Sequence, residues 1–286
     1  MLAERTERFA PVDSETTPGI LPAGCGCANA GAQPYTAYVL GQLGYDFETE
    51  NNWDSFVQRG VKNPQDPVQL LAHLDKEPWA AAALAWTVLQ EGVPLYAMYA
   101  GGPYARDLDL RFRQLLQLQL EGKVEMLSFP GDAGGSATLR QGQEVPILTP
   151  NLRGVCAWTT ADLSQSLATQ GSEAAAYLEN FLQRIYYEFQ NRGATARERA
   201  LNHAATNAFQ AASVCQDALG RGMTLDTVDA KPSRIGRVDS DCWDVEMTFF
   251  DPANRLTRAR HIYRFTIDVS QSIPVTIGTL QHWDAF

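Results

Sequence analysis

Alternation in one stretch of the sequence, residues 236–278, constrains the fold more than any other feature. Apolar side chains recur at every second position of its first half, as a half-buried β-strand requires. The segment Asp251-Pro-Ala-Asn254 then has turn chemistry, because proline fixes φ and both Asp and Asn tolerate turn conformations. Alternation resumes over 259–269. We therefore predict a β-hairpin that buries its two apolar faces together, with Trp243, Val245, Met247 and Phe249 on one strand and His261, Tyr263, Phe265, Ile267 and Val269 on the other.

The opposite face of this hairpin is charged. Arg260 and Arg264 are predicted to lie against Glu246 and Asp244. Cross-strand ion pairs of this kind contribute roughly 0.2 to 1 kcal/mol each. We interpret these carboxylates as an ion-paired surface and not as a pair for acid and base catalysis.

Strand and helix patterns are mixed in the rest of the chain. Strands are predicted over 35–47, on both sides of a turn at 90–93, over 124–129, over 137–148 with a turn at Gln141-Gly142, and over 225–230. Short helices are predicted over 52–59 and 66–75, the second with Asp66 as N-cap and Pro67 at its first position. A longer helix follows Gly101-Gly102-Pro103 and ends at Gly122, with Leu108, Phe112, Leu115, Leu116 and Gln119 at helical spacing.

Residues 172–219 have the pattern of two long helices. The first ends at Gly193, and Thr195 with Glu198 forms a capping box for the second. Small residues dominate the apolar stripe of the second helix, so the two can approach closely as an antiparallel pair. The order of elements predicts an α+β fold, in which antiparallel or mixed sheets pack against a long helix hairpin and a C-terminal β-hairpin closes the structure.

Domain organisation follows from length and composition. Residues 1–33 lack hydrophobic periodicity and are rich in Pro, Gly and Thr, so we expect a flexible N-terminal arm. Residues 34–286 suit a single domain, with 34–158 and 159–286 as candidate subdomains.

Five segments of the chain resemble one known family. They are YVLGQLGYDF, PNLRGVCAWTTADL, RALNHAATNAFQ, DSDCWDVEMTFFDP and YRFTIDVSQSIPVTIG, and they occur in one consistent order across 35–283. Together they are similar to the C-terminal domain of the PatA/PatG-type cyanobactin maturation proteases. The resemblance implies a domain that accompanies ribosomal peptide modification, and it implies no catalytic mechanism.

Charge and hydropathy exclude two classes of partner. The chain has 23 basic and 33 acidic residues, a net charge of −10, without the basic stripe that a nucleic-acid surface needs. No apolar run reaches the 18 or so residues of a membrane-spanning helix, and the charged N-terminus does not match a signal peptide. We therefore expect a cytoplasmic protein that binds neither nucleic acid nor membrane.

The five cysteines include one close pair, Cys25-Gly-Cys27. A structural zinc ion requires about four thiolate or imidazole ligands. Members of the resembled family carry a Cys-x-x-Cys-like pair before the first strand, and this chain is one residue shorter there. The candidate metal ligands are Cys25, Cys27 and Cys242 with a fourth still to be identified, and the alternative is two thiols of the arm plus a buried strand cysteine. Cys156 and Cys215 are assigned to packing.

The histidines form no recognisable motif. A nucleophilic pair of Cys242 with His203 or His261 is conceivable, because such partners meet in space and not in sequence. His73 and His282 have no comparable partner. Neither glycine-containing segment has the order of a phosphate-binding loop. We therefore predict no catalytic residues and no cofactor besides a structural zinc ion.

Together these observations favour a non-catalytic protein that binds the precursor (leader) peptide, or acts as a scaffold for the modifying enzymes, in a cyanobactin-like pathway of ribosomally made peptides. An extended peptide can add to a sheet edge as a further strand. Two alternatives remain. One is a small tailoring enzyme that uses a metal or a cysteine, and the other is a dimerisation or docking platform, which predicts a homodimer.

Overall fold

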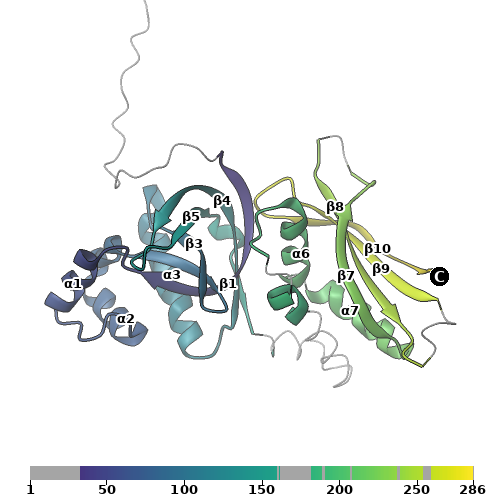
Figure 1. Cartoon of the computed structure of the whole chain (residues 1–286), viewed down its shortest axis with the longest axis horizontal. Helices are drawn as coiled ribbons and strands as arrows, with labels where there is room; N and C mark the ends of the chain where they lie inside the picture. Colours follow the sequence, from purple (N-terminus) through teal and green to yellow (C-terminus); the bar gives the residue numbers. More distant parts are fainter. Residues whose placement is uncertain are drawn as a thin grey trace, which may run out of the picture.

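A computed structural model describes residues 33–159, 161, 182–188, 191–206, 208–236, 239–253 and 259–285. The predicted arm, residues 1–33, lies outside this part of the chain except for its last residue. The described residues form two sheets with helices on both sides of the first, as an α+β class requires (Figure 1). None of the described helices is both long and apolar enough to cross a bilayer.

The first sheet has six strands in the order β1-β2-β3-β5-β4-β6. Because β1 also pairs with β4, the first five of these close into a ring. Their bounds are β1 Tyr35–Asp46, β2 Ala85–Gln90, β3 Val93–Met98, β4 Met126–Thr138, β5 Glu144–Pro150 and β6 Cys156–Trp158.

Strand β1 changes partner halfway along its length. Its residues 35–41 pair with 127–133 of β4, and its residues 42–46 pair with 85–89 of β2, both antiparallel. The change falls at Gly41, where a Cβ would lie 2.4 Å from the Leu89 carbonyl oxygen. Only glycine therefore permits the close approach of the two backbones at this point.

Helices cover the apolar side of this sheet. They are α1 (Glu50–Gln58), α2 (Pro67–Lys76) and α3 (Ala105–Leu120), with short 3-10 turns at η1 (Pro78–Ala83), η2 (Gly102–Tyr104) and η3 (Leu152–Gly154). The predicted cap of α2 is confirmed, because Asp66 accepts the Val68 N–H at 3.0 Å and Pro67 opens the helix. Trp86, Phe112 and Phe129 lie at the centre of the core between sheet and helices.

The second sheet is antiparallel in the order β10-β9-β8-β7. Its strands are β7 (Thr224–Pro232), β8 (Cys242–Phe250), β9 (Arg260–Asp268) and β10 (Val275–Ala285). The predicted hairpin is confirmed as β8 and β9, whose apolar faces are buried. Strand β10 was not predicted, because Gly278, with φ of 73°, interrupts its alternation with a bulge.

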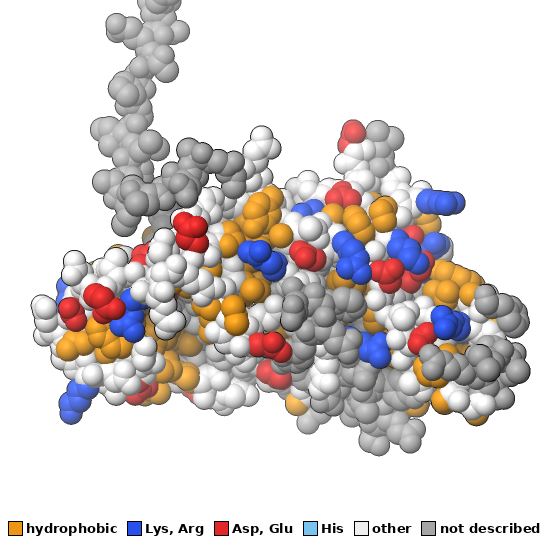
Figure 2. Space-filling model, in the orientation of Figure 1, with side chains coloured by type: hydrophobic (Ala, Val, Ile, Leu, Met, Phe, Trp, Pro, Cys, Tyr) orange, Lys and Arg blue, Asp and Glu red, His pale blue; other side chains and the backbone are white. Residues whose placement is uncertain are grey.

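One of the two predicted ion pairings is correct. Arg264 pairs with Asp244 at 3.4 Å, as predicted. Arg260 instead pairs with Asp226 of β7 at 3.5 Å, and Glu246 pairs with Lys231 of β7 at 2.9 Å. The sequence pattern defines the faces of a hairpin but not which third strand lies beside it. On the side of the molecule in Figure 2, basic and acidic side chains are interspersed.

The predicted helix pair is only partly within the described residues. Most of the first helix lies outside them, and 184–188 form a π-helical turn, η4 (Arg184–Glu188). The capping box is confirmed, since Thr195 Oγ1 accepts the Glu198 N–H at 3.2 Å and Glu198 accepts the Thr195 N–H at 3.0 Å. The second helix is two segments, α6 (Ala196–Thr206) and α7 (Ala208–Gly220). The Thr206 hydroxyl donates to the Asn202 carbonyl at 3.0 Å. A threonine hydroxyl that bonds the carbonyl four residues earlier often bends a helix.

Helix α6 lies between the two sheets (Figure 1). Asn202 donates to the Tyr38 carbonyl at 2.8 Å, and the Tyr38 N–H donates to the Gly193 carbonyl at 2.9 Å. Arg199 donates to the carbonyls of Thr36 on β1 and Val269 after β9, both at 2.9 Å. One apolar core therefore spans both halves of the chain, because Tyr38 and Leu40 of β1 belong to the same cluster of buried residues as the apolar side chains of α6 and of the second sheet.

Candidate functional site

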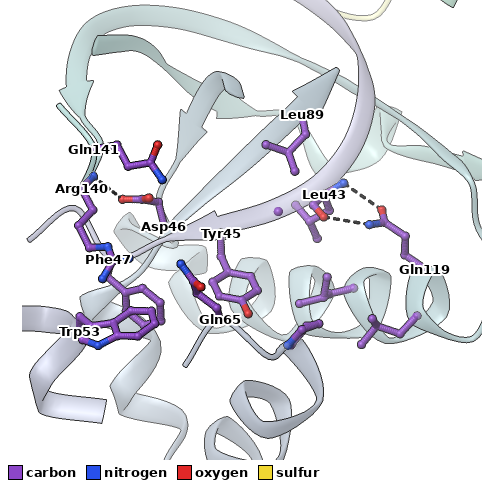
Figure 3. Close-up of a pocket in the computed structure, with 14 residues that line it drawn as sticks. Leu43, Tyr45, Asp46, Phe47, Trp53, Gln65, Leu89, Gln119, Arg140 and Gln141 are labelled. Atoms are coloured by element: carbon purple, nitrogen blue, oxygen red, sulfur yellow. Dashed lines mark hydrogen bonds between the residues drawn. The ribbon is translucent and has the colours of Figure 1, made fainter. Parts of the chain in front are cut away.

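The second half of β1 has a backbone edge that no strand in the described part of the chain covers. Leu43 lies opposite Val88 of β2, yet its N–H donates to Gln119 Oε1 at 2.9 Å and its carbonyl accepts from Gln119 Nε2 at 3.0 Å (Figure 3). Its backbone groups therefore point away from β2. In an antiparallel pair the groups of every second residue point the same way. The N–H and carbonyl of Tyr45 consequently project from the same edge as those of Leu43.

A cavity of about 300 Å³ opens along this edge. Residues 43–47 form one side, and Figure 3 shows Leu89 and Gln119 at one end with Trp53, Arg140 and Gln141 at the other. Side chains from β2, α1 and α3 make most of the wall apolar. The apolar members are Leu43, Phe47, Trp53, Pro67, Leu89, Leu116 and Leu120.

Polar groups fix the shape of the Trp53 end. Asp46 Oδ1 accepts the Arg140 N–H at 2.8 Å and the Glu48 N–H at 2.7 Å, which holds the β4–β5 turn against β1. The Arg140 guanidinium lies 4.1 Å from the centre of the Trp53 ring and 3.5 Å from Glu50. The charges of Asp46 and Arg140 offset one another, so the lining of the cavity carries no net charge.

Tyr45 forms a rigid part of the same wall. Burial raises the pKa of its phenol, and the Asp66 carboxylate raises the pKa further. The hydroxyl therefore stays protonated at neutral pH and donates to the Pro64 carbonyl at 3.1 Å. With the ring held in this way, the backbone of Tyr45 is presented to the cavity in an extended conformation.

A second polar cluster lies between α7 and the second sheet. His261 Nδ1 is 2.6 Å from Asp284 of β10, and Tyr263 donates its hydroxyl to Asp217, which also pairs with Arg221 at 3.1 Å. The hydrogen bond from Tyr263 is the main cause that lowers the pKa of Asp217, and burial raises the pKa of Tyr263. His261 Nε2 is buried without a hydrogen-bond partner among the described residues.

The predicted metal ligands are not brought together in the described residues. Cys25 and Cys27 lie outside them. Cys242 is buried at the start of β8, with Ser240 Oγ 3.3 Å from its sulfur. The described residues contain no group of three or more His, Cys, Asp or Glu side chains that could hold a metal ion.

The other cysteines and the histidines are dispersed. Cys215 is buried as predicted, and burial raises the pKa of its thiol to about 12. The assignment of Cys156 to packing is wrong, because in the short β6 only Trp158 faces the core and Cys156 is exposed. His203 lies on α6 beside Tyr38, whereas His261 is paired with Asp284, so neither forms the conceived pair with Cys242.

Sequence reasoning missed the cavity and the role of Gln119. The spacing of α3 had placed Gln119 on the buried side of the helix, and a glutamine at an apolar position is the one signal that could have drawn attention to it. Its backbone partner on β1, 76 residues away, leaves no mark in the local pattern.

Comparisons with known proteins agree on one family. The model of the family described as PatG C-terminal matches residues 168–283. A solved structure named "PatG Domain of Unknown Function" is 36% identical, with 87% of this chain and 99% of that chain covered and a TM-score of 0.77. No curated protein matches the chain in sequence.

Proposed function

Because this chain belongs to the PatG C-terminal family, which is linked to the cyanobactin pathway, we propose that it holds a precursor peptide in extended form without modifying it. The observation that supports this most directly is the uncovered edge of β1 at Tyr45. A peptide can bond such an edge through its main chain while adjacent pockets accept alternate side chains.

The geometry of the cavity suits this mode of binding. The cavity runs along an extended segment, so the ligand would lie parallel or antiparallel to β1. Its walls are mostly apolar and its one cation and one carboxylate already bond protein groups. Selectivity would therefore come from apolar side chains and main-chain hydrogen bonds. With a net charge of −10, the protein gains no long-range attraction for an acidic leader.

Two exposed leucines on α3 provide a matched test. Leu120 lines the cavity and is 41% exposed, while Leu110 lies outside it and is 47% exposed. Fluorescence anisotropy with labelled precursor peptide should show that Leu120→Arg weakens binding at least tenfold, because the cation enters an apolar wall. Leu110→Arg should bind as the wild type does. Absence of wild-type binding up to about 100 μM, a free energy weaker than about −5.5 kcal/mol, would contradict the proposal.

The zinc ion is a separate proposal. We propose that Cys25, Cys27 and Cys242 supply three of its ligands, because zinc sites are built from close cysteine pairs joined by a distant partner. Elemental analysis of the purified full chain should give one zinc per protein, with loss of the metal in Cys25→Ser. Protein without stoichiometric zinc after purification in zinc-containing buffer would overturn this assignment.

A further inference from the structure

The two outer strands of the second sheet differ in how their edges are protected. Exposed sheet edges attract other strands unless charges, proline or side-chain caps block them. Strand β7 is blocked at two points, because Arg184 donates to the Asp226 carbonyl at 2.6 Å and the Asp229 carboxylate accepts the Ala230 N–H at 2.8 Å. Pro232 ends the strand and has no N–H to offer.

The edges of the first sheet are closed except at one short stretch. Strand β6 has three residues, too few to accept a partner along a useful length. The first half of β1 is covered by Gly193 and Asn202, and the start of its second half by Gln119. What remains open there is the short cavity edge at Tyr45.

Strand β10 lacks the proline and the charged residues that protect other edges over most of its length. It is eleven residues long, and no strand in the described part of the chain pairs with its outer edge. No Asp, Glu, Lys or Arg occurs from Val275 to Trp283, and Asp284 pairs with His261 of its own sheet. Val275 is 57% and Leu280 38% exposed. The bulge near Gly278 divides the edge into two straight runs but adds no charge.

We propose that β10 pairs in antiparallel fashion with β10 of a second copy of this chain. Such a contact is isologous, because a two-fold axis presents the same surface on both sides. It would join two four-stranded sheets into one of eight strands. Two copies with a net charge of −10 each repel one another, so they associate best through an uncharged surface, and β10 from Val275 to Trp283 is uncharged.

The dimer is compatible with peptide binding but does not depend on it. In Figure 1 the second sheet lies at one end of the molecule, and the helices around the cavity lie at the other. Pairing through β10 would leave both cavities open and turned away from one another.

The test is the mass in solution of the full chain, measured by light scattering and sedimentation velocity over a concentration series. Wild type should approach twice the 31.5 kDa of one chain. Leu280→Lys should return the mass to that of one chain, because a buried unpaired cation opposes pairing. Ile235→Lys is the control, since Ile235 is 51% exposed outside β10, and it should remain dimeric. Circular dichroism spectra of all three proteins should agree, which separates lost pairing from misfolding.

Two results would overturn the proposal. A wild type of single-chain mass at every concentration excludes self-association, and a dimer that persists in Leu280→Lys places the interface elsewhere. If the wild type is a monomer and Leu280→Lys abolishes its binding of the precursor peptide, the edge of β10 would instead be the peptide-binding site. Loss of peptide binding in Leu120→Arg alone leaves the dimer proposal unaffected, so the two proposals fail separately.

Discussion

His203 shows how one side chain can make the stability of this fold depend on pH. Its imidazole is held between the Tyr38 ring, 5.8 Å away, and Thr276 of β10, with Nδ1 buried and unpaired. Burial lowers the pKa of His203 from 6.5 to about 4. The folded state therefore holds the neutral form over a range in which the unfolded chain binds a proton.

The direction of the effect follows from this difference. Stability from neutral His203 is complete above pH 6.5 and falls as the pH approaches 4, by on the order of 3 kcal/mol across that range. In His203→Gln this part of the loss should disappear. Urea unfolding at pH 7 and pH 4.5 measures it, with His282→Gln, at an exposed position, as the control. If His203→Gln lost as much free energy of unfolding between pH 7 and pH 4.5 as the wild type, other groups would cause the acid sensitivity.

Single residues also show what the sequence could and could not predict about the site. Asp66, Thr195 and Glu198 were correctly assigned as caps, because capping is a local bond that spans two or three residues. Gln119 and Tyr45 were not recognised, since their role depends on a strand and a helix that are far apart in the chain. The zinc ligands stay a prediction, with two of three outside the described residues.

Among the elements, α3 supplies through Gln119 the two backbone hydrogen bonds that a neighbouring strand would otherwise make to Leu43. Replacing Gln119 with Leu keeps the size of the side chain but leaves the Leu43 N–H and carbonyl without partners. We expect a loss of about 1 to 3 kcal/mol in the free energy of unfolding. Urea denaturation measures the change, and Gln114→Leu, an exposed position on the same helix, should alter stability little. Equal stability in both variants would mean that water replaces Gln119 at no cost.

The element pattern was predicted best where neighbours in sequence are neighbours in space. The β8–β9 hairpin, the β2–β3 hairpin and the turn before Gly142 follow from local chemistry. Strand β4 was not predicted at its full length, because its glycines suggested an interruption between 129 and 137. Gly131 in fact lies within the strand, where a Cβ would be 2.2 Å from the Thr149 carbonyl oxygen. Gly131 permits close packing with β5, and the two glycines at 134 and 135 lie at an irregularity of the β4–β5 register, so none of them ends the strand.

At the scale of the whole molecule, Arg199 joins the two sheets. Its side chain is 11% exposed, and its guanidinium donates to carbonyls of β1 and of the segment after β9. Arg199→Met should cost about 3 kcal/mol, because two carbonyls lose a charged donor. Differential scanning calorimetry should also show a broader transition as the two halves separate. Arg197 lies on the same helix, and Arg197→Met, which removes its exposed ion pair with Asp229 of β7, should do neither.

The exchange of partners along β1 limits how proteins of this shape can vary. Side chains on a strand alternate between faces, so a one-residue insertion or deletion in β1 would turn every later side chain to the wrong side. Such a change before Gly41 would reverse the wall of the cavity, and one after it would misplace the segment that leads into α1. Length differences between relatives should therefore accumulate in the connecting loops and leave this strand at a constant number of residues.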